Sequence, residues 1–230
     1  MCGESMKRVL VSIILFVCGL GIFLYPIITN YMNHYLYSTK VTNYEKIVSK
    51  LSLDEVSREF VKMNEYNQSL QGTTFHMEDP FSNNTKSSTY VQKINSTDGV
   101  LGSITIPKIN EELPIYMGAS EKNLSKGVGQ IEGTSLPIGG ESTHTVLAGH
   151  RGYQGATMFR YINKLQKGDE FYINILGKKL TYEVVGQEVI YPNDTEKLSI
   201  TKGKDRATLL TCEPYTSSKY RLLIYGERKN

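Results

Sequence analysis

Residues 9–28 form an uncharged, almost wholly apolar run that follows Lys7 and Arg8. A run of about twenty such residues is long enough to cross the hydrocarbon core of a bilayer as a helix. Basic residues before the run favour a cytoplasmic N-terminus, and no small-residue cleavage motif follows it. We therefore expect a single-pass protein of the cell membrane, with a cytoplasmic tail at residues 1–8, a transmembrane anchor at residues 9–28 and an extracytoplasmic remainder.

Cysteine usage is limited outside this anchor. Cys2 precedes the apolar run and Cys18 lies inside it, so Cys212 is the one cysteine expected in the extracytoplasmic part. A single cysteine cannot form an internal disulfide, and an exported thiol is then retained by chance or for its reactivity.

Charge and motif content exclude several classes of function. The chain carries a formal net charge of +3 over 230 residues, and no basic run is interleaved with aromatic residues, so nucleic acid is not an expected partner. There is no glycine-rich phosphate loop, and the four histidines are scattered without the spacing of metal ligands. We expect no cofactor and no metal; the sequence does not reveal the oligomeric state.

Residues 29–98 read as a helical segment followed by a long loop. Ser52 and Glu55 have the spacing of a capping box, which predicts a helix from Leu53 to about Tyr66. The stretch from 71 to 97 is rich in Ser, Thr and Asn, and it contains an apolar and acidic island at residues 76–81. Long loops of this kind in compact domains are usually either functional or disordered.

Residues 99–230 contain short strand patterns separated by turn signals, which predicts a mainly β domain with the form of a barrel or sandwich. One short helix is expected at Met158–Leu165. The expected strands are Gly102–Ile106, Leu113–Met117, Thr143–Ala148, Glu170–Ile175, Lys179–Gln187, Ala207–Thr211 and Arg221–Tyr225.

The last two strands place three reactive side chains within reach of one another. The residue that ends one strand of a hairpin lies near the residue that starts the next, so Cys212 is expected opposite Arg221. His150 ends another strand, beside a glycine. A thiol with an imidazole and a guanidinium nearby has the parts of a cysteine acyl-transfer site.

Other interpretations of these residues remain open. Free cysteine is often a small core residue, and then His150 and Arg221 would be unrelated to Cys212. His144 and His76 are alternative bases. His144 begins the strand that His150 ends, and about six residues of strand span roughly 20 Å, too far for both to serve Cys212.

Several of these motifs resemble the sortase family. Thr208-Leu209-Leu210-Thr211-Cys212 resembles the TLxTC signature, and residues 147–152 resemble the family's histidine motif. The step from Cys212 to Arg221 and the runs at residues 104–109, 113–116, 124–129 and 221–226 are similar to class C, the pilin-polymerising sortases of Gram-positive bacteria. The similarity extends from about Gly99 to the C-terminus.

The resemblance implies a closed β-barrel with short helices, in which Cys212 is the nucleophile, His150 the acid and base, and Arg221 the oxyanion or substrate clamp. Thr211 and Leu210 would lie in the substrate groove. Class C members also carry a lid with an Asp-Pro-aromatic motif, which matches Asp79, Pro80 and Phe81 here.

The implied activity is cleavage of an LPxTG-like sorting motif between Thr and Gly through a thioester, followed by transfer to a pilin lysine. The implied partners are pilin subunits that carry a C-terminal sorting motif and an acceptor lysine. Alternatives are a sortase that attaches proteins or pili to a cell-wall precursor and a non-catalytic, membrane-tethered assembly module.

Two departures from the class C pattern accompany these expectations. Many members have a second hydrophobic segment after the catalytic domain, whereas charged residues precede Asn230 here, so we expect an anchor at one end only. The stretch at residues 152–155 replaces a frequent Leu-Pro pair, so the substrate fit around His150 is expected to differ.

Overall fold

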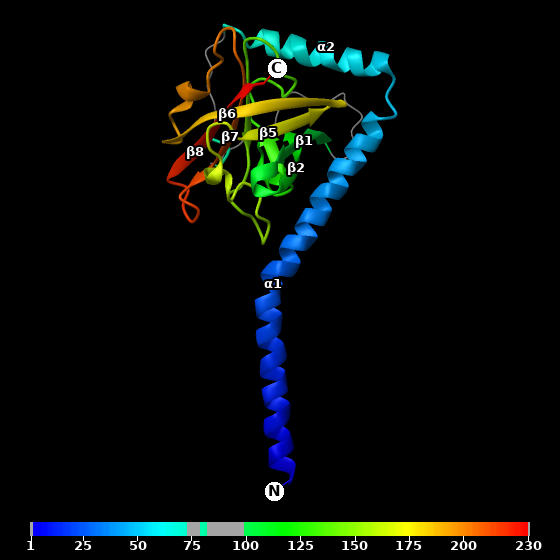
Figure 1. Cartoon of the computed structure of the whole chain (residues 1–230), viewed down its shortest axis with the longest axis vertical. Helices are drawn as coiled ribbons and strands as arrows, with labels where there is room; N and C mark the ends of the chain where they lie inside the picture. Colours follow the sequence, from blue (N-terminus) through cyan, green and yellow to red (C-terminus); the bar gives the residue numbers. More distant parts are fainter. Residues whose placement is uncertain (1, 73–78, 82–98, 230) are drawn as a thin grey trace.

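The protein consists of a closed β-barrel carried on a long N-terminal helix (Figure 1). This computed structural model describes residues 2–72, 79–81 and 99–229. The barrel order is β1-β2-β3-β4-β7-β8-β6-β5, in which the β2–β3 and β4–β7 pairs are parallel and the other pairs are antiparallel. The strands are β1 Val100–Ile106, β2 Glu111–Met117, β3 Val128–Gln130, β4 Thr143–Ala148, β5 Glu170–Ile175, β6 Lys178–Ile190, β7 Asp205–Glu213 and β8 Tyr220–Arg228.

The prediction of a mainly β barrel is confirmed, and each expected strand overlaps an observed one. The sequence reading missed β3, which has only three residues and no alternation to detect. The short helix predicted at Met158–Leu165 is present only in its second half. Met158 has a φ of 43°, which no α-helical residue adopts, and the segment contains only the 3-10 turn η3, Ile162–Lys164. The remaining short elements are α3 Glu121–Leu124, η2 Pro107–Ile109 and η4 Thr195–Leu198.

Alternation along the strands produces two separate apolar clusters. Leu147, Leu209 and Ile224 belong to the large core cluster, whereas their neighbours Val146 and Leu210 belong to a second one. Successive residues of a strand point to opposite faces, so the second cluster lies on the outer face of β4, β7 and β8. We call it the outer apolar cluster; it comprises Ala119, Leu124, Ile131, Val146, Ala148, Ile190, Leu198, Leu210 and Leu223.

The N-terminal helix α1, Cys2–Val48, includes the apolar run and continues past it to the barrel. It is long and apolar enough to cross a membrane, as the sequence predicts. Figure 1 shows that its first half projects away from the barrel and that the helix then bends to run alongside it. Pro26 lies inside the helix, where it removes a backbone hydrogen bond and so supplies a cause for the bend.

The second half of α1 is fixed against β1 and β2. Tyr37, Val41 and Tyr44 are buried, and the Tyr44 hydroxyl accepts a hydrogen bond from the Leu176 backbone at 2.9 Å. Tyr37 therefore packs on the barrel, while Tyr31 remains exposed.

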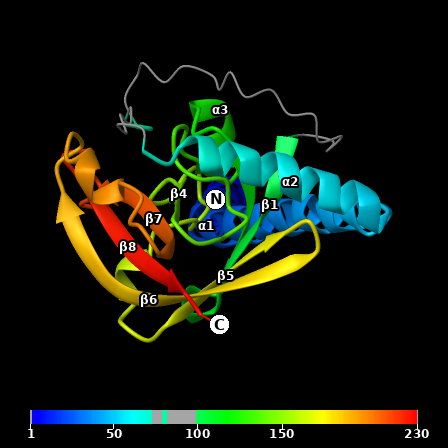
Figure 2. The same cartoon turned by 90° about the horizontal axis from the view of Figure 1, so that it is seen from above.

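Helix α2, Leu53–Ser69, crosses the end of the barrel that lies away from the N-terminus (Figures 1 and 2). The predicted capping box is present: the Glu55 backbone donates to the Ser52 hydroxyl at 3.2 Å, and the Ser52 backbone donates to the Glu55 carboxylate at 2.8 Å. Buried Asn67 holds the helix to the barrel through a pair of hydrogen bonds with the backbone of Leu136, at 2.7 and 3.2 Å.

Candidate active site

The β7–β8 hairpin places Cys212 directly opposite Arg221, as the sequence predicts. Both residues lie in phase with members of the outer apolar cluster, Cys212 with Leu210 and Arg221 with Leu223, so their side chains are on the outer face of the barrel. The Arg221 side chain is 97% buried, and its Nη1 donates to the backbone oxygens of Ser218 and Tyr220 at 2.7 and 2.8 Å. The hairpin loop therefore fixes a permanent cation beside the thiol.

His150 reaches the same place from β4, the strand parallel to β7. Ala148 pairs with Leu210, the Gly149 backbone donates to the Leu210 oxygen at 3.0 Å, and His150 follows, level with Cys212. The register of the two strands therefore places the thiol and the imidazole at the same end of β4 and β7.

Two side chains flank the His150 ring. Tyr153 stacks on it with ring centroids 4.8 Å apart. The carboxylate of Glu121, at the start of α3, lies 3.4 Å from Nε2, which has no hydrogen-bond partner. Burial lowers the pKa of His150, and the negative charge of Glu121 opposes that shift. The sequence reading found no acidic partner for His150, because Glu121 precedes it by 29 positions and only the fold brings the two together.

Asp79 and Phe81 cover the hairpin side of the site. Asp79 forms a bidentate ion pair with Arg221, in which Nε and Nη2 donate at 2.7 and 2.6 Å. The Phe81 ring lies 5.6 Å from the His150 ring and 5.2 Å from the Arg221 guanidinium carbon, and it packs on the outer apolar cluster. Pro80 between them is buried.

The electrostatic environment favours the protonated thiol in this arrangement. Burial raises the pKa of Cys212, and the carboxylate of Asp79 adds to that shift. The guanidinium groups of Arg221 and Arg151 oppose it. Because burial lowers the pKa of His150 as well, both shifts favour a neutral thiol beside a neutral imidazole.

Leu210 and Thr211 were both predicted to lie in the substrate groove, but their side chains point to opposite faces of β7. Leu210 belongs to the outer apolar cluster beneath Phe81, so it stays a candidate for the groove floor. Thr211 is fully buried, and its hydroxyl donates to the Gly149 oxygen at 2.7 Å. It links the strand that carries Cys212 to the one that carries His150 and presents no surface to a groove.

Arg151 is a second residue that links the His150 strand to the Cys212 strand, and the sequence analysis did not identify it. Its guanidinium donates to the Cys212 backbone oxygen at 3.1 Å and forms an ion pair with Glu213. The arginine next to the histidine therefore holds the residue after the cysteine, and only the parallel pairing of β4 with β7 reveals that contact.

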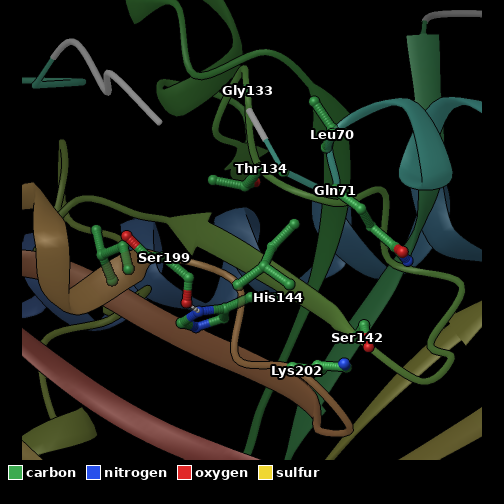
Figure 3. Close-up of a pocket in the computed structure, with 11 residues that line it drawn as sticks. Leu70, Gln71, Gly133, Thr134, Ser142, His144, Ser199 and Lys202 are labelled. Carbon is green, nitrogen blue, oxygen red and sulfur yellow. Dashed lines mark hydrogen bonds between the residues drawn. The ribbon is translucent and has the colours of Figure 1, made fainter. Parts of the chain in front are cut away.

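His144 is remote from the thiol, as strand length predicts. It lies at the opposite end of β4, where its ring nitrogens contact the Ser199 oxygen at 3.1 Å and the Thr208 hydroxyl at 2.7 Å. Burial lowers its pKa to about 4. Figure 3 shows it in a cavity of about 440 Å³ between Leu70 and Lys202. His76 lies outside the described residues.

A thiol, an imidazole and a guanidinium on the outer face of a closed barrel define the class of the site, that of cysteine acyl transfer. A model of the sortase domain matches residues 104–229. The chain belongs to the sortase family of cysteine transpeptidases.

Individual relatives agree with this assignment. Sortase D of Bacillus subtilis (strain 168) is 35% identical over 130 residues, which cover 55% of this chain and 63% of that protein. The chain thus spans less than two thirds of this curated relative.

Solved structures match over a longer region. Sortase C1 of Streptococcus agalactiae has a TM-score of 0.77 at 38% identity and covers 84% of this chain and 95% of its own. Sortase C of Streptococcus pneumoniae has a TM-score of 0.78 at 37% identity, covering 83% of this chain and 96% of its own. A "lid-mutant" of the Streptococcus agalactiae enzyme is also similar, with a TM-score of 0.74 at 36% identity over 83% of this chain and 97% of its own.

Proposed function

We propose that this protein is a membrane-anchored pilin polymerase. In this proposal it cleaves an LPxTG-like motif between Thr and Gly and joins the Thr carbonyl to a lysine of the next pilin subunit. The observation that carries the proposal is the bidentate ion pair between Asp79 and Arg221, with Phe81 packed beside His150. An Asp-Pro-aromatic segment over the site is the feature that marks class C among sortases, and the similar solved structures include sortases C.

The first chemical step is attack by the Cys212 sulfur on the Thr carbonyl carbon. His150 takes the thiol proton, and the positive charge of Arg221 stabilises the oxyanion that forms on the carbonyl oxygen. His150 then gives that proton to the glycine nitrogen, the C–N bond breaks, and a thioester remains on Cys212.

The second step reverses these roles. The amine nitrogen of a lysine attacks the thioester carbonyl, His150 takes a proton from it, and the Cys212 sulfur leaves as a thiolate that is reprotonated. The product is an isopeptide bond. The neutral resting pair suits this cycle, because His150 can accept a proton only when its imidazole is neutral.

The segment of Asp79, Pro80 and Phe81 acts as a lid in this proposal. Arg221 cannot stabilise an oxyanion while two of its nitrogens donate to Asp79. Phe81 occupies apolar surface on which the leucine and proline of a sorting motif would pack. Displacing the lid would free the guanidinium and expose Leu210 at the same time.

The membrane placement follows from α1. We propose that residues 9–28 cross the membrane with residues 1–8 in the cytoplasm, and that residues 29–230 are extracytoplasmic. Loop 150–160 and the β7–β8 loop lie at the end of the barrel from which α1 descends (Figure 1). With residues 9–28 in the bilayer, as proposed, the active site would face the membrane.

The proposal is tested by incubating the full chain, reconstituted in lipid nanodiscs, with a pilin subunit that has an LPxTG-like tail, and mapping the products by mass spectrometry. Thr-to-Lys isopeptide bonds that are absent with Cys212→Ala are the expected result. Thioester or hydrolysis without lysine links would favour attachment to a cell-wall precursor, and no reaction even with Phe81→Ala would favour a non-catalytic module.

A further inference from the structure

An open pocket of about 590 Å³ lies between α1 and the corner where β1 meets β2. From α1 it is lined by Tyr31, His34, Tyr35 and Ser38, which lie on one face of the helix at positions i, i+3, i+4 and i+7. The barrel side is lined by Thr105, Pro107, Asn110, Glu111 and Glu112. Neither lysine nor arginine is among these lining residues, so the pocket has two carboxylates and no permanent cation.

Glu111 is the unusual member of this set. Its side chain is 97% buried, and its Oε2 has no hydrogen-bond partner among the described residues. The other oxygen, Oε1, accepts a hydrogen bond from the Thr157 hydroxyl and lies 3.6 Å from His34 Nε2. A buried carboxylate oxygen without a partner costs free energy until a proton or a cation satisfies it.

The chemistry of the pocket indicates which cation fits. Among the described residues, no group of three His, Cys, Asp or Glu side chains is arranged to hold a metal ion, and hard divalent cations need a larger set of oxygen ligands. Two carboxylates, the hydroxyls of Ser38 and Thr105, and the exposed rings of Tyr31 and Tyr35 are instead the surroundings that an organic ammonium group prefers.

The pocket is connected to the candidate active site by loop 151–158. Thr157 of this loop binds Glu111, and the backbone oxygen of Gln154 accepts a hydrogen bond from Asn33 of α1 at 3.2 Å. Tyr153 of the same loop stacks on His150. A protein seated in the pocket would therefore lie beside the loop that carries one wall of the reaction site.

We propose that this pocket binds a lysine side chain of the protein that supplies the accepting amine, with its ammonium group on Glu111 and Glu112 and its methylenes against Tyr31 and Tyr35. The contact is a docking contact, separate from the lysine that reacts at Cys212. This inference rests on the proposed use of a protein amine as acceptor. Burial raises the pKa of Glu111 to about 7, and a bound ammonium group would hold it ionised.

Steady-state kinetics with two kinds of acceptor tests this proposal. The full chain in nanodiscs is given a sorting-motif peptide and either a pilin subunit or hydroxylamine, a small nucleophile that needs no docking. For Glu111→Gln we expect about a tenfold rise in the KM for the pilin and unchanged turnover with hydroxylamine, because a charge-assisted contact is lost while the chemistry is intact. Glu65→Gln, at an exposed position of α2, removes the same charge elsewhere and should change neither value.

The outcomes separate this inference from the proposed function. If wild-type protein forms no thioester, the proposed function fails and the pocket inference falls with it. If hydroxylamine supports turnover but Glu111→Gln leaves the pilin KM unchanged, the pocket inference alone is wrong. An effect that appears only in discs containing phosphatidylethanolamine would assign the ammonium to a lipid and also overturn it. Should Glu111→Gln unfold, Tyr35→Leu at an exposed position tests the same contact and should also raise the pilin KM.

Discussion

Replacing Asp79 by Asn should lower the pKa of Cys212 and accelerate its reaction with a thiol reagent. Asp79 holds Arg221 in a bidentate ion pair, and its negative charge raises the pKa of the thiol. Asparagine keeps the size of the side chain and removes the charge. Arg221 would then act on the thiol without a compensating carboxylate.

The size of the effect follows from the position of the charge. Arg221 stands opposite Cys212, and opposed residues of antiparallel strands have Cα atoms about 5 Å apart. Asp79 binds the far side-chain end of Arg221, so we take a separation of roughly 8 Å between its carboxylate and the sulfur. At an effective dielectric constant of about 20, one charge at that distance contributes about 2 kcal/mol, so removing it favours the thiolate and lowers the pKa of Cys212. Since a thiolate of lower pKa is a weaker nucleophile, only about half of that free energy appears in the rate, and we expect the labelling rate at pH 7 to rise about five- to eightfold from this cause alone.

The assay is the rate of Cys212 alkylation as a function of pH, with Cys2 and Cys18 replaced by serine and alanine in every protein compared. Greater access to the site raises the rate at every pH, whereas the electrostatic effect moves the midpoint of the curve downward. Asp54→Asn, an exposed position on α2, is the control for net charge. A midpoint that does not move, or that moves upward, would show that the Asp79 carboxylate does not raise the pKa of Cys212.

Three further variants test other parts of the site and the fold. Arg221→Ala should reduce the rate of thioester formation about 10²- to 10³-fold, measured in a single turnover, and near-normal turnover would remove it from the mechanism. Glu121→Gln should move the acidic limb of the pH–rate profile to lower pH, because the carboxylate raises the pKa of His150; the shift should be small, since solvent screens a side chain that is 68% exposed. Asn67→Ala removes two buried hydrogen bonds and should cost about 2–3 kcal/mol in free energy of unfolding, whereas Asn64→Ala on the exposed face of α2 should cost little; equal losses would contradict the role given to Asn67.

Much of the fold could be predicted from the sequence, because strands, hairpins and helix caps are each specified by residues that are close together in the chain. Alternating apolar residues and turn residues located seven of the eight strands, and the hairpin argument placed Cys212 opposite Arg221. The capping box of α2 was likewise a four-residue pattern that the structure contains. The three-residue strand β3 and the left-handed backbone conformation of Met158 depend on packing in the surrounding barrel, and no local sequence pattern predicts either of them.

The features that were missed depend on contacts between distant parts of the chain. Glu121 reaches His150, and Glu111 acquires its unpaired oxygen, only when α3 and α1 are packed on the barrel. Thr211 was expected in the groove because it precedes the cysteine, yet the same alternation that turns Cys212 outward turns Thr211 inward. Strand phase, applied residue by residue, would have corrected that assignment from sequence alone.

The most direct test of the account is to capture the acyl intermediate. The full chain in nanodiscs, carrying Phe81→Ala to expose the site, is mixed with an LPxTG-like peptide and quenched in acid for intact-mass and peptide-map analysis. We expect a mass increase equal to the peptide cut after Thr, located on Cys212 and released by hydroxylamine. An adduct on another residue, or none under conditions where Cys212 still reacts with an alkylating reagent, would contradict it.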